Sequence, residues 1–133
     1  MHANDTNKKP EIIYSELSYQ VTGFLFEVHN TLGRYAKERQ YGDALESLLA
    51  KSNLKYEREK ALPVELVENL RTNLADFVVD GKIVLEIKAK DVVLKEDYFQ
   101  IQRYLQAGNY KLGLVVNFRS KYLRPIRVIR ANS

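Results

Sequence analysis

Two amphipathic segments open the chain, and each has apolar residues at helical spacing. Over Ile12–Leu32 these residues recur three or four positions apart, which predicts a helix that packs one stripe against a core. Ser15 is expected to cap its start and Gly33 to end it. The same periodicity predicts a second helix over Lys37–Lys51. Its inward positions are Tyr41, Ala44, Leu45, Leu48 and Leu49.

Two strand-like apolar runs meet within the stretch Leu74–Lys88. Asp80-Gly81 between them favours a hairpin turn, because Gly and Asp tolerate the backbone conformations of tight turns. Side chains alternate along a strand, so Glu86 and Lys88 are expected on one face. A two-residue loop would place Asp76 on the face opposite Glu86, whereas a three-residue loop or a bulge would place it on the same face. We predict the longer loop or the bulge.

The remaining pattern predicts more strands and one more helix. The helix covers Lys95–Ala107, with Gly108 at its end, and Leu112–Phe118 is a continuous apolar run of the kind covered on both faces. The order α-α-β-β-β-β-α-β-β gives an α/β (α+β) fold with a mixed central sheet flanked by helices. The other predicted strands are Leu54–Glu59, Pro63–Leu70 and, at an edge, Tyr122–Ile129.

Composition is that of one globular domain over residues 12–133, preceded by a polar tail over residues 1–11 that we expect to be disordered. The 133 residues are 45% hydrophobic and 29% charged, as is ordinary for such a domain. Cysteine is absent, so a metal would have to be held by oxygen atoms or by the two histidines. No run is long enough for a membrane helix and no signal peptide is evident, so we expect a cytoplasmic protein.

Charge is distributed unevenly along the chain. The last 36 residues, Tyr98–Ser133, carry seven basic side chains and no acidic one. A basic segment of this kind fits binding to phosphates, and it fits equally well a solvated edge strand protected by Lys and Arg.

Ionisable residues of the hairpin suggest chemistry. Two carboxylates, Asp76 and Glu86, with Lys88 beside them suggest a divalent metal next to a catalytic ammonium group, although a solvated face with Lys88 paired to a carboxylate would look the same. Gln100 and Tyr104 lie four apart and so share a face of the third helix. They could orient a lysine or bind a phosphate, or Tyr104 could simply pack in the core.

Taken in order, these residues resemble the PD-(D/E)-x-K nuclease superfamily, whose core is restriction-endonuclease-like. More closely, the chain is similar to the small bacterial GxxExxY proteins of that superfamily. Tyr35 stands at the naming glycine and Ala75 at the proline. The matching motifs are Val28-His29-Asn30-Thr31-Leu32-Gly33, Glu38-x-x-Tyr41, Ala75-Asp76-Phe77-Val78-Val79, Leu85-Glu86-Ile87-Lys88-Ala89, Gln100-x-x-x-Tyr104-Leu105 and Leu112-Gly113-Leu114-Val115-Val116-Asn117-Phe118.

The resemblance implies a metal site and a catalytic lysine. Asp76, Glu86 and the carbonyl of Ile87 would bind Mg²⁺ or Mn²⁺, and Glu38, otherwise explained by its place in the first helical turn, would reach the metal directly or through water. Lys88 would act on the attacking water and on the transition state. The other implied roles are the positioning of Lys88 or the phosphate by Gln100 and Tyr104, and the binding of flanking phosphates by Arg103, Arg119 and Lys121.

The function expected from the resemblance is metal-dependent hydrolysis of nucleic acid, with DNA favoured over RNA as the partner and no membrane association. The alternative is a nucleic-acid-binding or protein-interaction module that keeps the fold without turnover. The small size of the chain favours this alternative, because it leaves little surface to select a substrate. A homodimer or a protein partner is a candidate for the same reason.

Overall fold

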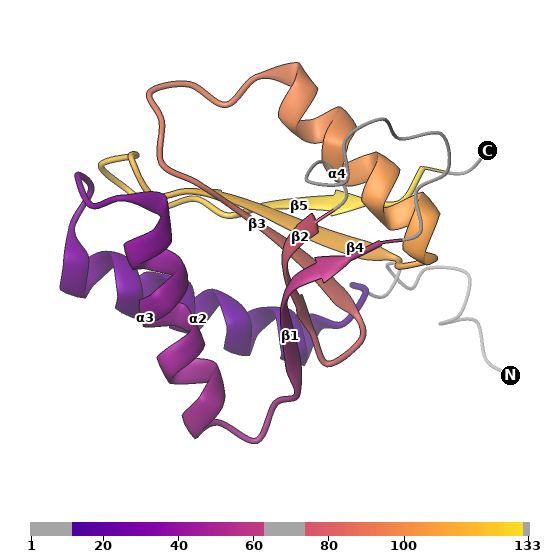
Figure 1. Cartoon of the computed structure of the whole chain (residues 1–133), viewed down its shortest axis with the longest axis horizontal. Helices are drawn as coiled ribbons and strands as arrows, with labels where there is room; N and C mark the ends of the chain where they lie inside the picture. The colour runs from indigo at the N-terminus through magenta and orange to yellow at the C-terminus, as the bar shows by residue number, and fades with distance from the viewer. Residues whose placement is uncertain (1–11, 63–73, 132–133) are drawn as a thin grey trace, which may run out of the picture.

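The computed structural model describes residues 12–62 and 74–131. Within these ranges, a five-stranded sheet with the order β1-β2-β3-β4-β5 is covered by α2 and α3 on one face and by α4 on the other (Figure 1). The helices are α2 (Ser15–Leu32), α3 (Glu38–Lys51) and α4 (Lys95–Gly108), and the strands are β1 (Tyr56–Ala61), β2 (Leu74–Val79), β3 (Ile83–Lys88), β4 (Leu112–Asn117) and β5 (Ile126–Ile129).

The sheet is mixed, as predicted. Strands β3 and β4 are parallel, and the other neighbouring pairs are antiparallel. A parallel pair needs a crossover connection, and α4 supplies it from the opposite side of the sheet to α2 and α3. The carboxyl ends of β3 and β4 therefore lie side by side at Lys88 and Asn117.

The central hairpin has the three-residue loop that places its carboxylates together. Val79 pairs with Ile83, which leaves Asp80, Gly81 and Lys82 in the loop. Asp80 and Gly81 adopt φ values of 57° and 64°, the left-handed region that Asp and Gly tolerate best. The prediction of an odd-numbered loop is confirmed.

Two helix ends differ from the prediction. Ser15 does not cap α2, because it is already the first helical residue, and Tyr14 occupies the capping position with φ 52° and no side-chain hydrogen bond. Gly108 is still helical, and the left-handed residue that ends α4 is Asn109, with φ 58°. Asn is the residue after Gly that best accepts this conformation, so the predicted end was one residue early. Gly33 ends α2 with φ 75°, as predicted.

Other boundaries shift by a few residues. Strand β1 lies two residues later than predicted, and β5 is shorter than the predicted edge strand but stands last in the sheet order. The predicted strand Pro63–Leu70 and the predicted tail over residues 1–11 lie outside the described residues. In the described part of the chain, no helix combines the length and apolar character needed to cross a membrane.

The two faces of the sheet form separate cores, and strand alternation decides which residue joins which. Ile83, Leu85 and Ile87 pack against α2 and α3, while Val84 packs against α4. Alternation is interrupted in β2, where Ala75 joins the α4 side but Phe77 joins the other. Asp76 lies at this interruption.

Candidate active site

Asp76 and Glu86 come together where β2 and β3 meet. The backbone N–H of Ile87 donates a 2.7 Å hydrogen bond to Asp76 Oδ2, and that of Asp76 lies 3.4 Å from Glu86 Oε1. The two carboxyl groups also share a side-chain hydrogen bond. The Asp76 carboxylate therefore accepts the Ile87 N–H, which in a regular strand pair would bond to a backbone carbonyl. The two acidic side chains lie in direct contact.

Burial makes this contact unfavourable for two charges. Glu86 is only 4% exposed, and its pKa is raised well above 4.5 by desolvation, then by the charge of Asp76 and their shared hydrogen bond. Desolvation also raises the pKa of Asp76, although the hydrogen bond from Ile87 opposes the change. Lys88 lowers both pKa values, but not enough to reverse either shift. The pair is short of positive charge.

Lys88 ends β3 on the same face as Glu86, and its ammonium group is held by an acid on α4. Lys88 Nζ lies 3.8 Å from Asp97 Oδ1, with the lysine side chain 17% exposed. Asp97 Oδ2 accepts hydrogen bonds from Leu94 N and, at 2.5 Å, from Lys90 Nζ. Burial raises the pKa of Asp97, but the hydrogen bonds and the charges of Lys88 and Lys90 outweigh it, so that the net shift is downward.

Asn117 fixes the backbone that follows Lys88. Its side-chain amide donates to Lys90 O at 2.7 Å and accepts from Lys90 N at 3.1 Å. Phe118 N donates to Lys88 O at 2.9 Å. The end of β4 thereby fixes the backbone where the chain leaves β3, from which the side chains of Lys88 and Lys90 extend.

Glu38, the first residue of α3, faces the same site. Desolvation of its carboxyl group, followed by the charge of Asp76, raises its pKa, and Lys88 opposes the shift. The buried Tyr41 fixes the preceding loop by donating a 2.5 Å hydrogen bond to Gly33 O and accepting one from Ala36 N. The Glu38-x-x-Tyr41 motif thus joins a carboxylate to the residue that anchors its loop.

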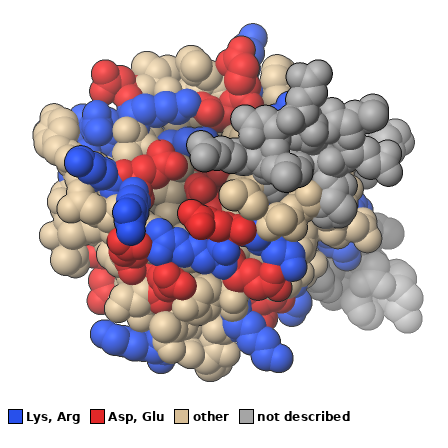
Figure 2. Space-filling view, viewed as in Figure 1, with Lys and Arg blue, Asp and Glu red and all other residues tan. Residues whose placement is uncertain are grey.

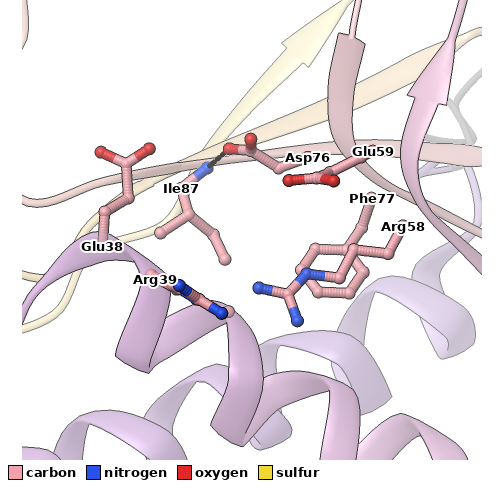
Figure 3. Close-up of a pocket in the computed structure, with 8 residues that line it drawn as sticks. Glu38, Arg39, Arg58, Glu59, Asp76, Phe77 and Ile87 are labelled. Atoms are coloured by element: carbon pink, nitrogen blue, oxygen red, sulfur yellow. Dashed lines mark hydrogen bonds between the residues drawn. The ribbon is translucent and has the colours of Figure 1, made fainter.

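A cavity of about 330 Å³ opens between α3 and the hairpin. Figure 3 shows the carboxyl groups of Glu38 and Asp76 on either side of the Ile87 amide, with the guanidinium groups of Arg39 and Arg58 below them. Arg58 is paired with Asp43 and Glu46 at 2.7 and 2.9 Å. The cavity therefore has a carboxylate wall and a guanidinium wall. Its lining is completed by Gly42, Glu59 and Phe77.

The predicted pair on α4 lies next to the carboxylates. Gln100 Nε2 donates a 3.0 Å hydrogen bond to Tyr104 Oη, and Tyr104 is 1% exposed. Desolvation first, then the charge of Glu86, raises the pKa of Tyr104 to about 12. The phenol is therefore protonated at neutral pH and can donate a hydrogen bond but cannot serve as a base. Arg103 on the same helix is exposed.

The predicted phosphate-binding residues are in different situations. Lys121 is exposed, whereas the guanidinium of Arg119 donates to Arg34 O and Ala89 O and lies 3.5 Å from Asp91. Arg127 likewise binds Ser18 and the carbonyl of Ile13. In Figure 2, Lys and Arg alternate with Asp and Glu across the visible face. The visible face therefore carries no single-signed basic patch.

The donors at this site fit a divalent cation. The buried Glu86 and the half-buried Asp76 offer the oxygen ligands that Mg²⁺ and Mn²⁺ prefer. A cation would offset the desolvation that raises the pKa of both groups and the charge of Asp76 that adds to the shift at Glu86. Among the described residues, no three His, Asp or Glu side chains form a ready cluster around one metal position. Glu38 faces the cavity without joining the Asp76–Glu86 contact, so direct ligation by Glu38 stays a prediction, as does ligation by the carbonyl of Ile87.

Two residues of the site, Asp97 and Asn117, were not anticipated from the sequence. Asp97 sits three residues after Leu94, the spacing of a residue that caps a helix start. Asn117 is the polar residue that closes an apolar parallel strand, the edge at which functional groups of such sheets gather. Both signals are present in the sequence, but only the packing of α4 and β4 against β3 places Asp97 and Asn117 next to Lys88 and Lys90.

Comparison with protein families supports the assignment that the motifs suggested. Neither the curated proteins nor the solved structures that were compared gave a match. The family model described as PD-(D/E)XK nuclease superfamily matches residues 15–129, which include every residue placed at the site above. The match covers most of the chain, and the chain belongs to the PD-(D/E)XK nuclease superfamily.

Proposed function

We propose that the protein is a metal-dependent nuclease that hydrolyses phosphodiester bonds, with DNA as the first substrate class. The observation that carries the proposal is the contact between the half-buried Asp76 and the buried Glu86, with Lys88 next to Glu86 on the same strand face. Water screens the repulsion between exposed carboxylates, but two carboxylates in contact away from water repel each other strongly unless a cation is bound.

Asp76, Glu86 and the carbonyl of Ile87 would hold Mg²⁺ or Mn²⁺, with Glu38 acting directly or through water. When bound, such a cation makes bound water a stronger nucleophile and polarises the phosphate. Lys88 would orient the attacking water and offset the negative charge that grows on the phosphate oxygens. Tyr104, held protonated and hydrogen-bonded to Gln100, supports a donor role toward the phosphate or toward the group that positions Lys88.

Flanking phosphates would be bound by cations around the cavity. Arg103 and Lys121 are exposed and suit contacts that fix the position of the strand without reading sequence. Arg119 would contribute mainly charge, since its donors already bind the protein. Arg39 on the cavity wall is a further candidate.

We also infer that the chain is one of the GxxExxY proteins within the superfamily. The support is the Glu38-x-x-Tyr41 motif, in which Tyr41 binds both Gly33 and Ala36. Tyr35 in place of the naming glycine is compatible with this anchoring, because the hydrogen bonds use the flanking residues of the loop.

A second candidate is a nucleic-acid or protein-binding module without turnover. It is favoured by one observation: Lys88 is paired with Asp97, 3.8 Å away, and a lysine held in this way is less available to a water molecule. A bound cation and substrate would have to draw Lys88 toward the carboxyl pair for catalysis.

The test is cleavage of labelled single- and double-stranded DNA and RNA in Mg²⁺, Mn²⁺ or EDTA. We expect metal-dependent cleavage that falls about 10²- to 10⁴-fold in Lys88→Ala, the range of a lost acid–base or electrostatic group. Lys82→Ala, in the hairpin loop directly before β3, is the matched control and should cleave normally. Equal cleavage by Lys88→Ala would refute the assigned role, and absence of cleavage with metal binding retained would favour the binding module.

A further inference from the structure

Tyr35 presents an aromatic ring to solvent in the loop between α2 and α3. The residue is 74% exposed, and the guanidinium carbons of Arg34 and Arg119 lie 5.1 and 5.6 Å from the ring centroid. These distances are within the range of cation–π interactions. Most of the ring surface remains accessible although two cations are next to it.

The backbone that carries this ring is held in place. Tyr41 Oη binds the loop on both sides of Tyr35, at Gly33 O and Ala36 N. Arg34 Nε donates to Arg119 O at 2.8 Å, and Arg119 Nε donates to Arg34 O at 2.9 Å. The ring is thus an exposed group on a fixed loop, which lowers the entropy lost when a ligand contacts it.

Two connections place the Tyr35 ring close to the candidate active site: the short chain segment to Glu38 and the contact of Arg119 with Ala89. Tyr35 precedes Glu38 by three residues, which an extended chain spans in about 10 Å. Arg119 donates to the carbonyl of Ala89, the residue after Lys88. Figure 1 shows the α2–α3 loop, the β3–α4 connection and the β4–β5 turn gathered at one end of the molecule.

We propose that Tyr35, flanked by Arg34 and Arg119, is a stacking site for an unpaired nucleobase next to the scissile phosphate. An exposed aromatic ring accepts a base face of any sequence, and neighbouring arginines add cation–π and phosphate contacts. In an intact duplex the base faces are covered by their neighbours, so this site selects single-stranded or locally unpaired nucleic acid. The inference rests on the proposed function and names its substrate class.

The experiment measures binding of a fluorescein-labelled single-stranded DNA in EDTA, where no cleavage occurs, by fluorescence anisotropy. Wild type is compared with Tyr35→Ala and Tyr35→Phe. Tyr19→Ala is the matched control, because Tyr19 is 84% exposed and lies on α2, about 20 Å from the end of that helix at Leu32. The duplex of the same sequence and the same strand with abasic positions are the other two ligands, and circular dichroism verifies folding.

We expect Tyr35→Ala to bind the single strand about 5- to 150-fold more weakly, the equivalent of one lost stacked base. Tyr35→Phe and Tyr19→Ala should bind as wild type does, and the abasic strand should bind wild type and Tyr35→Ala equally. Equal binding of the normal single strand by Tyr35→Ala and wild type would overturn the stacking site. If wild type also cleaves, the proposed function survives that result; absence of binding and cleavage by wild type would overturn both.

Discussion

Glu86 and Asp97 are two poorly exposed acids within reach of Lys88, yet their pKa values shift in opposite directions. Glu86 lies beside the carboxyl group of Asp76, and its pKa is raised by desolvation first and then by the charge of Asp76. Asp97 has two lysines and a backbone N–H, and its pKa is lowered. Burial acts in the same direction on both, so the neighbours decide the result. The comparison indicates that positive charge is sufficient at Asp97 and insufficient at the Asp76–Glu86 pair.

The largest expected effect is stabilisation by a divalent metal bound at the Asp76–Glu86 pair. At a Mn²⁺ concentration 100 times its dissociation constant, binding to the folded state alone adds about 2.7 kcal/mol to the free energy of unfolding. Thermal denaturation of wild type should show this increase, and Glu86→Gln should lose most of it. Glu96→Gln, an exposed acid in the first turn of α4, removes the same charge and should respond as wild type. An equal increase in Glu86→Gln would place the metal elsewhere.

Removal of the charge at Asp97 should have the opposite consequence to removal of the charge at Glu86. Asp97→Asn leaves Lys88 and Lys90 without their shared carboxylate and should lower the free energy of unfolding by about 2 kcal/mol, less than the loss of one partner in a fully buried pair. Glu86→Gln should stabilise the metal-free protein, since it removes a buried like-charge contact. Urea denaturation in EDTA measures both changes. Stabilisation by Asp97→Asn would contradict the comparison.

The pH dependence of stability separates the two acids without relying on metal. The folded-state pKa of Glu86 lies above its ordinary value of 4.5, so the folded state binds the proton first and stability rises as pH falls from neutrality toward 4.5. The folded-state pKa of Asp97 lies below 3.8; its stabilising contribution is complete above 3.8 and is lost as pH falls through the folded value. In urea titrations at several pH values, Glu86→Gln should flatten the rise and Asp97→Asn the fall. Unchanged profiles would refute these shifts.

The smallest expected effect concerns the phenol of Tyr104, next to the Asp76–Glu86 pair. Tyr104→Phe removes the acceptor of the Gln100 amide and should cost about 1 kcal/mol of unfolding free energy, as for an ordinary lost hydrogen bond. Cleavage should fall by less than in Lys88→Ala, because the phenol assists rather than performs the reaction. A loss of cleavage as large as that of Lys88→Ala would assign Tyr104 a direct role. Tyr98→Phe, on the same helix, is the control.

The hydrophobic pattern was sufficient for most of the fold because each element has its own periodicity. The stripes of α2 and α3, the continuous apolar run of β4 and the turn residues at Asp80-Gly81 are local signals. Helix ends were less predictable: Gly108 and Asn109 both tolerate the left-handed conformation, and in the structure it is Asn109 that adopts it. The candidate residues Asp76, Glu86 and Lys88 were recognisable from their order and spacing, and the loop length needed to unite the two acids was predicted correctly.

By itself the sequence determined the order of the elements that the structure describes, the alternation of β3 and the residue types by which the superfamily was recognised. Tertiary structure alone decided which charges neutralise one another. Asp97 reaches Lys88 and Lys90 only because α4 crosses back over the sheet, and Asn117 fixes Lys90 only because β4 lies parallel to β3. Electrostatic energy depends on distance and burial, which separation along the chain does not specify, whereas periodicity is a property of the chain.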